Sequence, residues 1–411
     1  MLVCKQFKVI HNHTKSDFSH KTYSGFKKSD VLSAFSKSIK KGKIENANTW
    51  SIEMILSGYI ENYWKKIIPF ISKEINIYNT YLPIYIINLY EQYNNLIEKK
   101  IDNIEMRNIL EIRNNICGIT NIISLSTKKP LPKFPKINKD NVGIIHDKSK
   151  LLARDLNLIK PFIKVNDNTE VIVAINELAT VLNINNNTYA HQEKCMFWLA
   201  WLQYYSIEKG DKICGERITT GVHQSLSRDV SFFIWQIILN EAKNRENARL
   251  YNCIVSLCKL FKTYITKGNI KTKYIHLQHA CLLLLNTLPG INFKMSIFPN
   301  TESYIKYTCK INYYYQKIIN DTKRKFYENV QKEESKKKVK LPEKIEIINT
   351  NHGDTYKKFV NKTKREDEIP PEAKPLNKKN KLVMCEINSL LTNEYDIANH
   401  MSQEYENYGK K

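Results

Sequence analysis

The chain has 411 residues, of which 42% are hydrophobic and 26% charged, a composition that excludes a wholly disordered protein. Lys and Arg number 64 against 41 acidic residues, a net charge of +23, which favours a polyanionic partner such as DNA or RNA. Part of this excess follows from the abundance of Lys, Asn, Ile and Tyr, the residues of AT-rich codons. The charge therefore supports nucleic-acid binding without establishing it.

Amphipathic runs with sparse Gly and Pro, 12 of each, predict a mainly α fold. We expect an extended lead-in at 1–22 and a first helical domain at 23–127. Its helices are predicted at 29–39, 46–56, 63–71, 82–97 and 102–116. Ser29 and Asp30 are candidate N-caps of the first helix, and Gly42 and Gly58 are expected to end the first two.

A Pro/Lys-rich linker is predicted at 128–150, because Pro130, Pro132 and Pro135 fall within six positions and cannot lie inside a helix. A second helical domain is predicted at 151–330. Its helices are expected at 171–182, 191–206, 227–242, 248–264, 274–288 and, as one long basic helix, 303–329. The β-branched run after Glu170 would suit a strand, but its continuation to Leu182 favours a helix. A basic flexible segment at 331–383 and a short helix and tail at 384–411 complete the chain.

The first predicted helices carry a gapless pattern made of Asp30, Ser33, Ala34, Phe35, Lys37, Ser38, Ile39, Ala47 and Trp50. Ser72, Glu74 and Asn79 extend the pattern. It resembles the start of the helical C-terminal region of the RarA/MgsA family, clamp-loader-like AAA+ ATPases that act at replication forks. The match covers about 50 residues between roughly 30 and 80, with departures at Lys73 and Asn76.

The resemblance implies a helical packing and oligomer-contact module from a replication setting. The residues alone are equally typical of a helical hairpin in which Phe35, Ile39, Ala47 and Trp50 are buried between two antiparallel helices. Both interpretations stay open at this point.

The sequence lacks the ATPase that accompanies this region in the family. A phosphate-binding loop needs Gly-x-x-x-x-Gly-Lys-Ser/Thr, and the spacing from Gly210 to Gly215 is followed by Glu216 and Arg217. No other enzymatic motif stands out. We therefore expect a protein without enzymatic activity, catalytic residues or cofactor.

The cysteines and histidines have irregular spacing. Cys253, Cys258, His276, His279 and Cys281 are conceivable zinc ligands, but zinc knuckles use closer pairs, so we expect buried thiols and no metal. Nine cysteines without a disulfide framework and the absence of an apolar leader in residues 1–22 predict an intracellular protein, cytoplasmic or nuclear. No apolar stretch approaches the roughly 20 residues of a membrane span, so we expect no membrane partner.

Basic stretches interleaved with tyrosines are the candidate nucleic-acid-binding residues. The predicted set is Lys37, Lys40, Lys41, Lys43, Lys306, Lys310, Lys317, Lys323, Arg324, Lys325, Lys336, Lys337 and Lys338. The tyrosines would stack on bases or pack on the core, and both alternatives stay open.

These observations predict a basic helical protein associated with DNA replication or genome handling, acting through nucleic acid, expected to be DNA, and through other subunits or self-association. The codon bias suggests a large DNA virus, a parasite or another AT-rich source, so the protein could be virus-encoded. The alternative is a structural or scaffolding component of a virion or ribonucleoprotein particle, whose extended arms order on neighbouring subunits.

Overall fold

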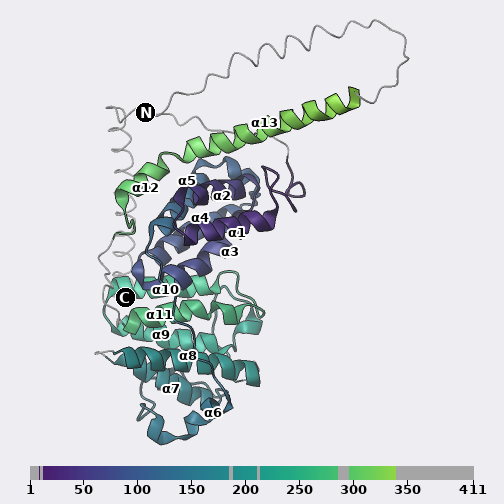
Figure 1. The fold of residues 1–411 in the computed structure, drawn as a ribbon. Helices are drawn as coiled ribbons and strands as arrows, with labels where there is room; N and C mark the ends of the chain where they lie inside the picture. The colour runs from purple at the N-terminus through teal and green to yellow at the C-terminus, as the bar shows by residue number, and fades with distance from the viewer. Residues whose placement is uncertain (1–8, 10–12, 185–187, 211–212, 286–295, 339–411) are drawn as a thin grey trace, which may run out of the picture. The chain divides into compact units, whose positions relative to one another are not determined.

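The computed structural model describes residues 9, 13–184, 188–210, 213–285 and 296–338. Their regular secondary structure is helical, apart from an isolated bridge between Lys21 and Lys27 (Figure 1). This confirms the mainly α fold. Residues 6–323 form one compact unit, and the last turns of α13 from Arg324 belong to a second unit.

The first group of helices builds one hydrophobic core. It contains α1 (Lys28–Lys40), α2 (Ile44–Leu56), α3 (Ile60–Phe70), α4 (Leu82–Glu98) and α5 (Leu110–Leu125). A π-helical turn at Ile71–Ile75 and 3₁₀ turns at Asn76–Tyr78 and Glu105–Asn108 connect them. Apolar side chains at helical spacing, among them Phe35, Tyr63 and Trp64, fill this core.

A second core is built by the helices that follow. These are α7 (Thr169–Asn183), α8 (Tyr189–Lys209), α9 (Val230–Asn244), α10 (Ala248–Lys262) and α11 (Tyr274–Leu285). The short α6 (Lys139–Val142) and 3₁₀ turns at Gly143–His146, Lys148–Lys150 and Lys160–Phe162 precede them. Asn168, Asp229 and Asn247 accept backbone hydrogen bonds at the first turns of α7, α9 and α10, so short polar side chains start three of these helices.

The chain then returns to the first core. α12 (Thr301–Thr308) packs along α5 (Figure 1). Ile311 and Tyr315 of α13 (Ile311–Lys338) are buried in the first core. Segments far apart in the sequence thus complete one core.

The predicted linker contacts both groups. Lys129 N donates to Glu74 O at 2.7 Å, Leu131 N donates to Lys73 O at 2.9 Å, and Gln278 Nε2 donates to Pro132 O at 2.6 Å. Its backbone therefore pairs with the π-helical turn and with α11. The predicted boundaries at 127 and 151 stay predictions.

Several local expectations agree with the structure. Gly42 and Gly58 follow α1 and α2 with φ of +66° and +69°, the left-handed conformation that favours glycine at helix ends. The run after Glu170 is helical, in α7. Phe35, Ile39 and Ala47 are buried, as expected for the hairpin of α1 and α2.

Other expectations are wrong in detail. Trp50 is only half-buried and lies edge-on against Phe26, with ring centroids 5.5 Å apart. Ser29 and Asp30 lie inside the first turn of α1, whose N-cap is Lys27 and has no side-chain hydrogen bond.

The helix predicted at 102–116 is instead a turn followed by α5. Asp102 Oδ1 accepts from Ile104 N at 2.7 Å, which favours a turn at the point where we expected the helix to begin.

The long helix predicted at 303–329 is broken. α12 ends at Thr308 and α13 begins at Ile311, so that Tyr304 packs near Gly118 of α5 while Ile311 and Tyr315 enter the core. α13 runs on to Lys338, into the segment predicted to be flexible. The remainder of that segment and the helix predicted within 384–411 lie outside the described residues.

Candidate nucleic-acid interface

The turn between α1 and α2 presents four of the predicted lysines. Lys37, Lys40, Lys41 and Lys43 are exposed around Gly42. A Cβ on Gly42 would lie 3.2 Å from Ser124 O, so this turn approaches the end of α5 closely because the residue is glycine. Packing therefore holds these lysines at a defined place on the first group.

Lys40 is partly neutralised. Its Nζ lies 2.9 Å from Glu74 Oε1, and the lysine side chain is far more exposed than the carboxylate. Glu74 sits in the π-helical turn that follows α3. The pair thus joins the end of α1 to that turn and leaves Lys37, Lys41 and Lys43 as the more available cations of the turn.

A second set of predicted lysines lies on α12 and the start of α13. Lys306, Lys317 and Lys323 are exposed and Lys310 is half-buried. Tyr313, three residues after Lys310 and four before Lys317, is 59% exposed. The opposite side of the helix carries Ile311 and Tyr315 into the core. Helical spacing therefore places Tyr313 and Lys317 on the outer side of α13, whereas Lys306 lies on α12 and Lys310 in the turn between the two helices.

Glu45 joins the two sets. It lies in the first turn of α2, and its Oε1 is 3.7 Å from Lys310 Nζ and accepts from Tyr314 OH at 3.2 Å. The lysines of the α1–α2 turn precede it by a few residues. The fold thus brings together basic clusters that are more than 260 residues apart in sequence. Below, the lysine surface means Lys37, Lys41, Lys43, Lys306 and Lys310.

Lys128 belongs beside this surface and was missed by the sequence analysis. Its Nζ donates to Ser124 O and Ser126 O, both at 2.8 Å, at the end of α5 where the Gly42 turn is seated. An ammonium at a helix C-terminus satisfies open carbonyls and suits the helix dipole. Burial lowers the pKa of Lys128 to about 8. The sequence around Lys128, which precedes a proline-rich run, gave no indication that this lysine would lie at the end of α5.

Five of the predicted basic residues belong to the second unit. Arg324 and Lys325 are exposed and belong to the second unit, where Arg324 Nε is 3.9 Å from Glu328 Oε1. Lys336, Lys337 and Lys338 continue α13, and their side chains are outside the described part of the structure.

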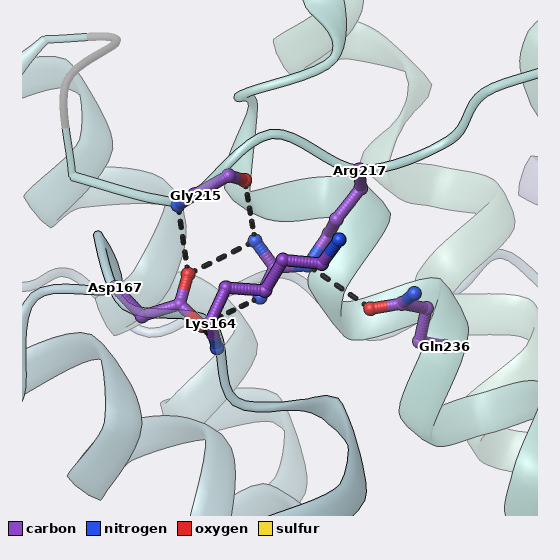
Figure 2. A network of polar contacts seen from close by, with 5 residues as sticks. All are labelled: Lys164, Asp167, Gly215, Arg217 and Gln236. Carbon is purple, nitrogen blue, oxygen red and sulfur yellow. Dashed lines mark hydrogen bonds and ion pairs between the residues drawn. The ribbon is translucent and has the colours of Figure 1, made fainter.

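The stretch from Gly210 to Arg217, whose spacing was compared with a phosphate-binding loop, contributes Gly215 and Arg217 to a buried polar network (Figure 2). α8 precedes it, and Gly210 ends that helix. Arg217 donates to both carboxylate oxygens of Asp167, at 3.0 and 2.9 Å, and also to Gln236 Oε1 and Gly215 O. Its guanidinium lies 3.8 Å from the ring centroid of Phe233. Arg217 therefore links the 213–217 segment to Asp167 and to α9.

A small cavity of about 210 Å³ lies between the end of α8 and the start of α9. Lys271 Nζ donates to Ser206 Oγ and lies 3.6 Å from Asp229 Oδ2. A serine nucleophile needs the opposite arrangement, in which the hydroxyl donates to a base. The cluster therefore acts as a polar link between helices.

The conceivable zinc ligands are buried. Cys253, Cys258 and Cys281 are free buried thiols in the second core. Ser72 Oγ lies 2.8 Å from His276 Nδ1 and 3.2 Å from His279 Nδ1, so the two imidazoles share one hydroxyl. Across the described ranges, no three potential metal ligands converge.

Comparisons with known proteins add no relative. No family model, no curated protein and no solved structure matches the chain. Among the helices of the described residues, none has the length and apolar character needed to cross a membrane.

Proposed function

We propose that this protein binds nucleic acid, DNA in the first instance, through the lysine surface and acts with other subunits in replication or genome handling. The observation that carries the proposal is the position of Glu45, which contacts Lys310 and Tyr314 and so unites two basic clusters. The net charge of +23 supplies a long-range attraction for a polyanion. The replication setting rests on the resemblance of segment 30–80 to the RarA/MgsA region.

The geometry suits contact with a phosphate backbone more than recognition of a sequence. Flexible ammonium groups neutralise phosphates as point charges, and an exposed tyrosine ring offers a stacking platform for an unpaired base. Tyr313 stands between Lys310 and Lys317 on the outer face of α13. We therefore propose binding with strong salt dependence and weak sequence preference.

The test is a salt titration of DNA binding by a triple variant, Lys41→Gln, Lys43→Gln and Lys306→Gln. Each lost phosphate contact should reduce the slope of log K against log salt concentration by about 0.9 on duplex DNA. The three changes together should then lower the slope by about 2.7.

A matched control changes three exposed lysines of the second group, Lys194, Lys209 and Lys243, to Gln. The control removes the same charge without touching the lysine surface. Equal reductions of the salt slope in the two triple variants would show that DNA binding depends on net charge alone and not on the lysine surface. Absence of DNA binding by the unaltered protein at low salt would refute the proposal.

A second candidate, a scaffold role in a larger assembly, is favoured by exposed aliphatic side chains in the loops held by Arg217. Val165 and Ile218 are 101% and 93% exposed, and they lie close in sequence to Asp167 and Arg217. Single exposed apolar residues are common, so this candidate ranks second. The native particle mass with and without nuclease separates the two: a large nuclease-resistant particle favours the scaffold.

A further inference from the structure

Arg113 is a buried cation without a counter-ion in the described residues. Its side chain lies on α5, the residue is 1% exposed, and none of its three guanidinium nitrogens has a hydrogen-bond partner there. Arg217 is equally buried but donates to Asp167, Gln236 and Gly215. Burying an unpaired charge is unfavourable, so the buried position of Arg113 lowers the free energy of unfolding of the protein.

One aromatic side chain covers this arginine. The Arg113 Cζ lies 4.8 Å from the ring centroid of Tyr315, and Tyr315 OH donates to Arg107 O at 3.0 Å. Burial raises the pKa of Tyr315, and the guanidinium groups of Arg113 and Arg107 oppose that rise. The cation–π contact compensates part of the cost of burial but supplies no acceptor for the five N–H groups.

Glu53, a buried carboxylate of α2, already has hydrogen-bond partners. Glu53 accepts from Ser24 N and Ser24 Oγ, both at 2.7 Å, on the turn before α1. Arg113 therefore lies beneath Tyr315 without a hydrogen bond to any carboxylate of the described residues.

Few fully buried side chains hold the start of α13 in place over Arg113. Of the described residues of α12 and α13, Ile311 and Tyr315 alone are fully buried. The other anchors are less buried: Tyr314, Ile318 and Ile319 pack partly buried against the first core, and Ser24 Oγ lies 3.0 Å from Thr322 Oγ1. Elements with few buried contacts open at a lower free energy than the core.

We propose that Arg113 is a phosphate-binding residue that the first turns of α13, residues 311–323, occlude and release. A planar guanidinium pairs with two phosphate oxygens at once, so an opened Arg113 gains the acceptors that it lacks under Tyr315. Nucleic acid on the lysine surface would then favour the open state, because only that state offers the additional phosphate contact. This inference rests on the proposed function and adds a regulated site to it.

A reversible disulfide tests the occlusion. Ser24→Cys and Thr322→Cys place thiols where the two hydroxyl oxygens are 3.0 Å apart, in a background with Cys4, Cys309 and Cys385 changed to Ser. The oxidised protein, with α13 held closed, should bind duplex DNA about tenfold more weakly, with a salt slope lower by about 0.9. Reduction should restore both. One protein serves for both states, so a folding defect cannot imitate the result.

Arg113→Met is the matched variant. It should bind DNA as weakly as the oxidised protein, respond little to oxidation in the disulfide background, and melt at the same or a higher temperature than the unaltered protein. Equal DNA affinity of the oxidised and reduced forms would overturn the inference. If the lysine triple variant weakens binding while the disulfide does not, the proposed function survives and only the occluded site fails.

Discussion

Removal of the Asp167 carboxylate should be among the most destabilising single changes in the second core. Asp167 accepts from Arg217 Nη1 and Nη2 and from the backbone N–H groups of Gly215 and Lys164, at 2.7–3.0 Å. In Asp167→Ala, the guanidinium of Arg217 stays buried without its counter-ion. Breaking a buried ion pair in this way costs about 3–5 kcal/mol of unfolding free energy.

The ion pair between Lys259 and Glu91 is the control. Its N···O distance is 2.9 Å, the same as the Arg217–Asp167 distance, but its side chains are 48% and 47% exposed, against 1% and 0% for Arg217 and Asp167. Solvent screening and side-chain entropy reduce an exposed pair to about 0.2–1 kcal/mol. Burial, and not distance, should therefore decide the difference.

The assay is urea unfolding followed by far-UV circular dichroism and tryptophan fluorescence, applied to a double-mutant cycle. Asp167→Ala and Arg217→Met should each destabilise strongly. The double variant should cost about 2 kcal/mol less than their sum, since it leaves no unpaired charge. Additive costs, or an Asp167→Ala cost below about 1 kcal/mol, would refute the reasoning.

Two further predictions concern the buried histidines of α11 and the glycine that follows α2. Burial holds the pKa of His279 at about 3 and that of His276 well below its ordinary 6.5. The unfolded chain therefore binds more protons than the folded chain below pH 6.5, and stability should fall by about 1.4 kcal/mol per pH unit for each histidine as the pH drops. Urea midpoints at pH 7 and 5 test this, and a flat profile would contradict it. Gly58→Ala places a Cβ 2.7 Å from Ile104 Cγ1 at a φ of +69°, whereas Gly25→Ala, at +82°, meets nothing within 4 Å. In thermal unfolding, Gly58→Ala should lower the free energy of unfolding by about 1–3 kcal/mol more than Gly25→Ala does. Equal losses would contradict the expected effect of the close contact with Ile104.

The sequence alone determined the helical class and the place of most helices. Apolar residues at spacings of three and four, such as Val31, Phe35 and Ile39 in α1, are a local property of the chain. Glycine at the ends of α1 and α2 is equally local, because it depends on φ at a single residue. These predictions were correct because each depends only on residues within a single helix or a single turn.

Only the tertiary structure decided where the helices meet and which charges are neutralised. The break between α12 and α13 depends on how Tyr304 and Ile311 fit α5 and the first core, which no pattern within 303–329 records. Glu45 joins Lys310 and Tyr314 across more than 260 residues, and Arg113 is buried by an aromatic ring from α13. Such contacts arise from packing between distant segments, so a sequence shows their residues but not their pairing.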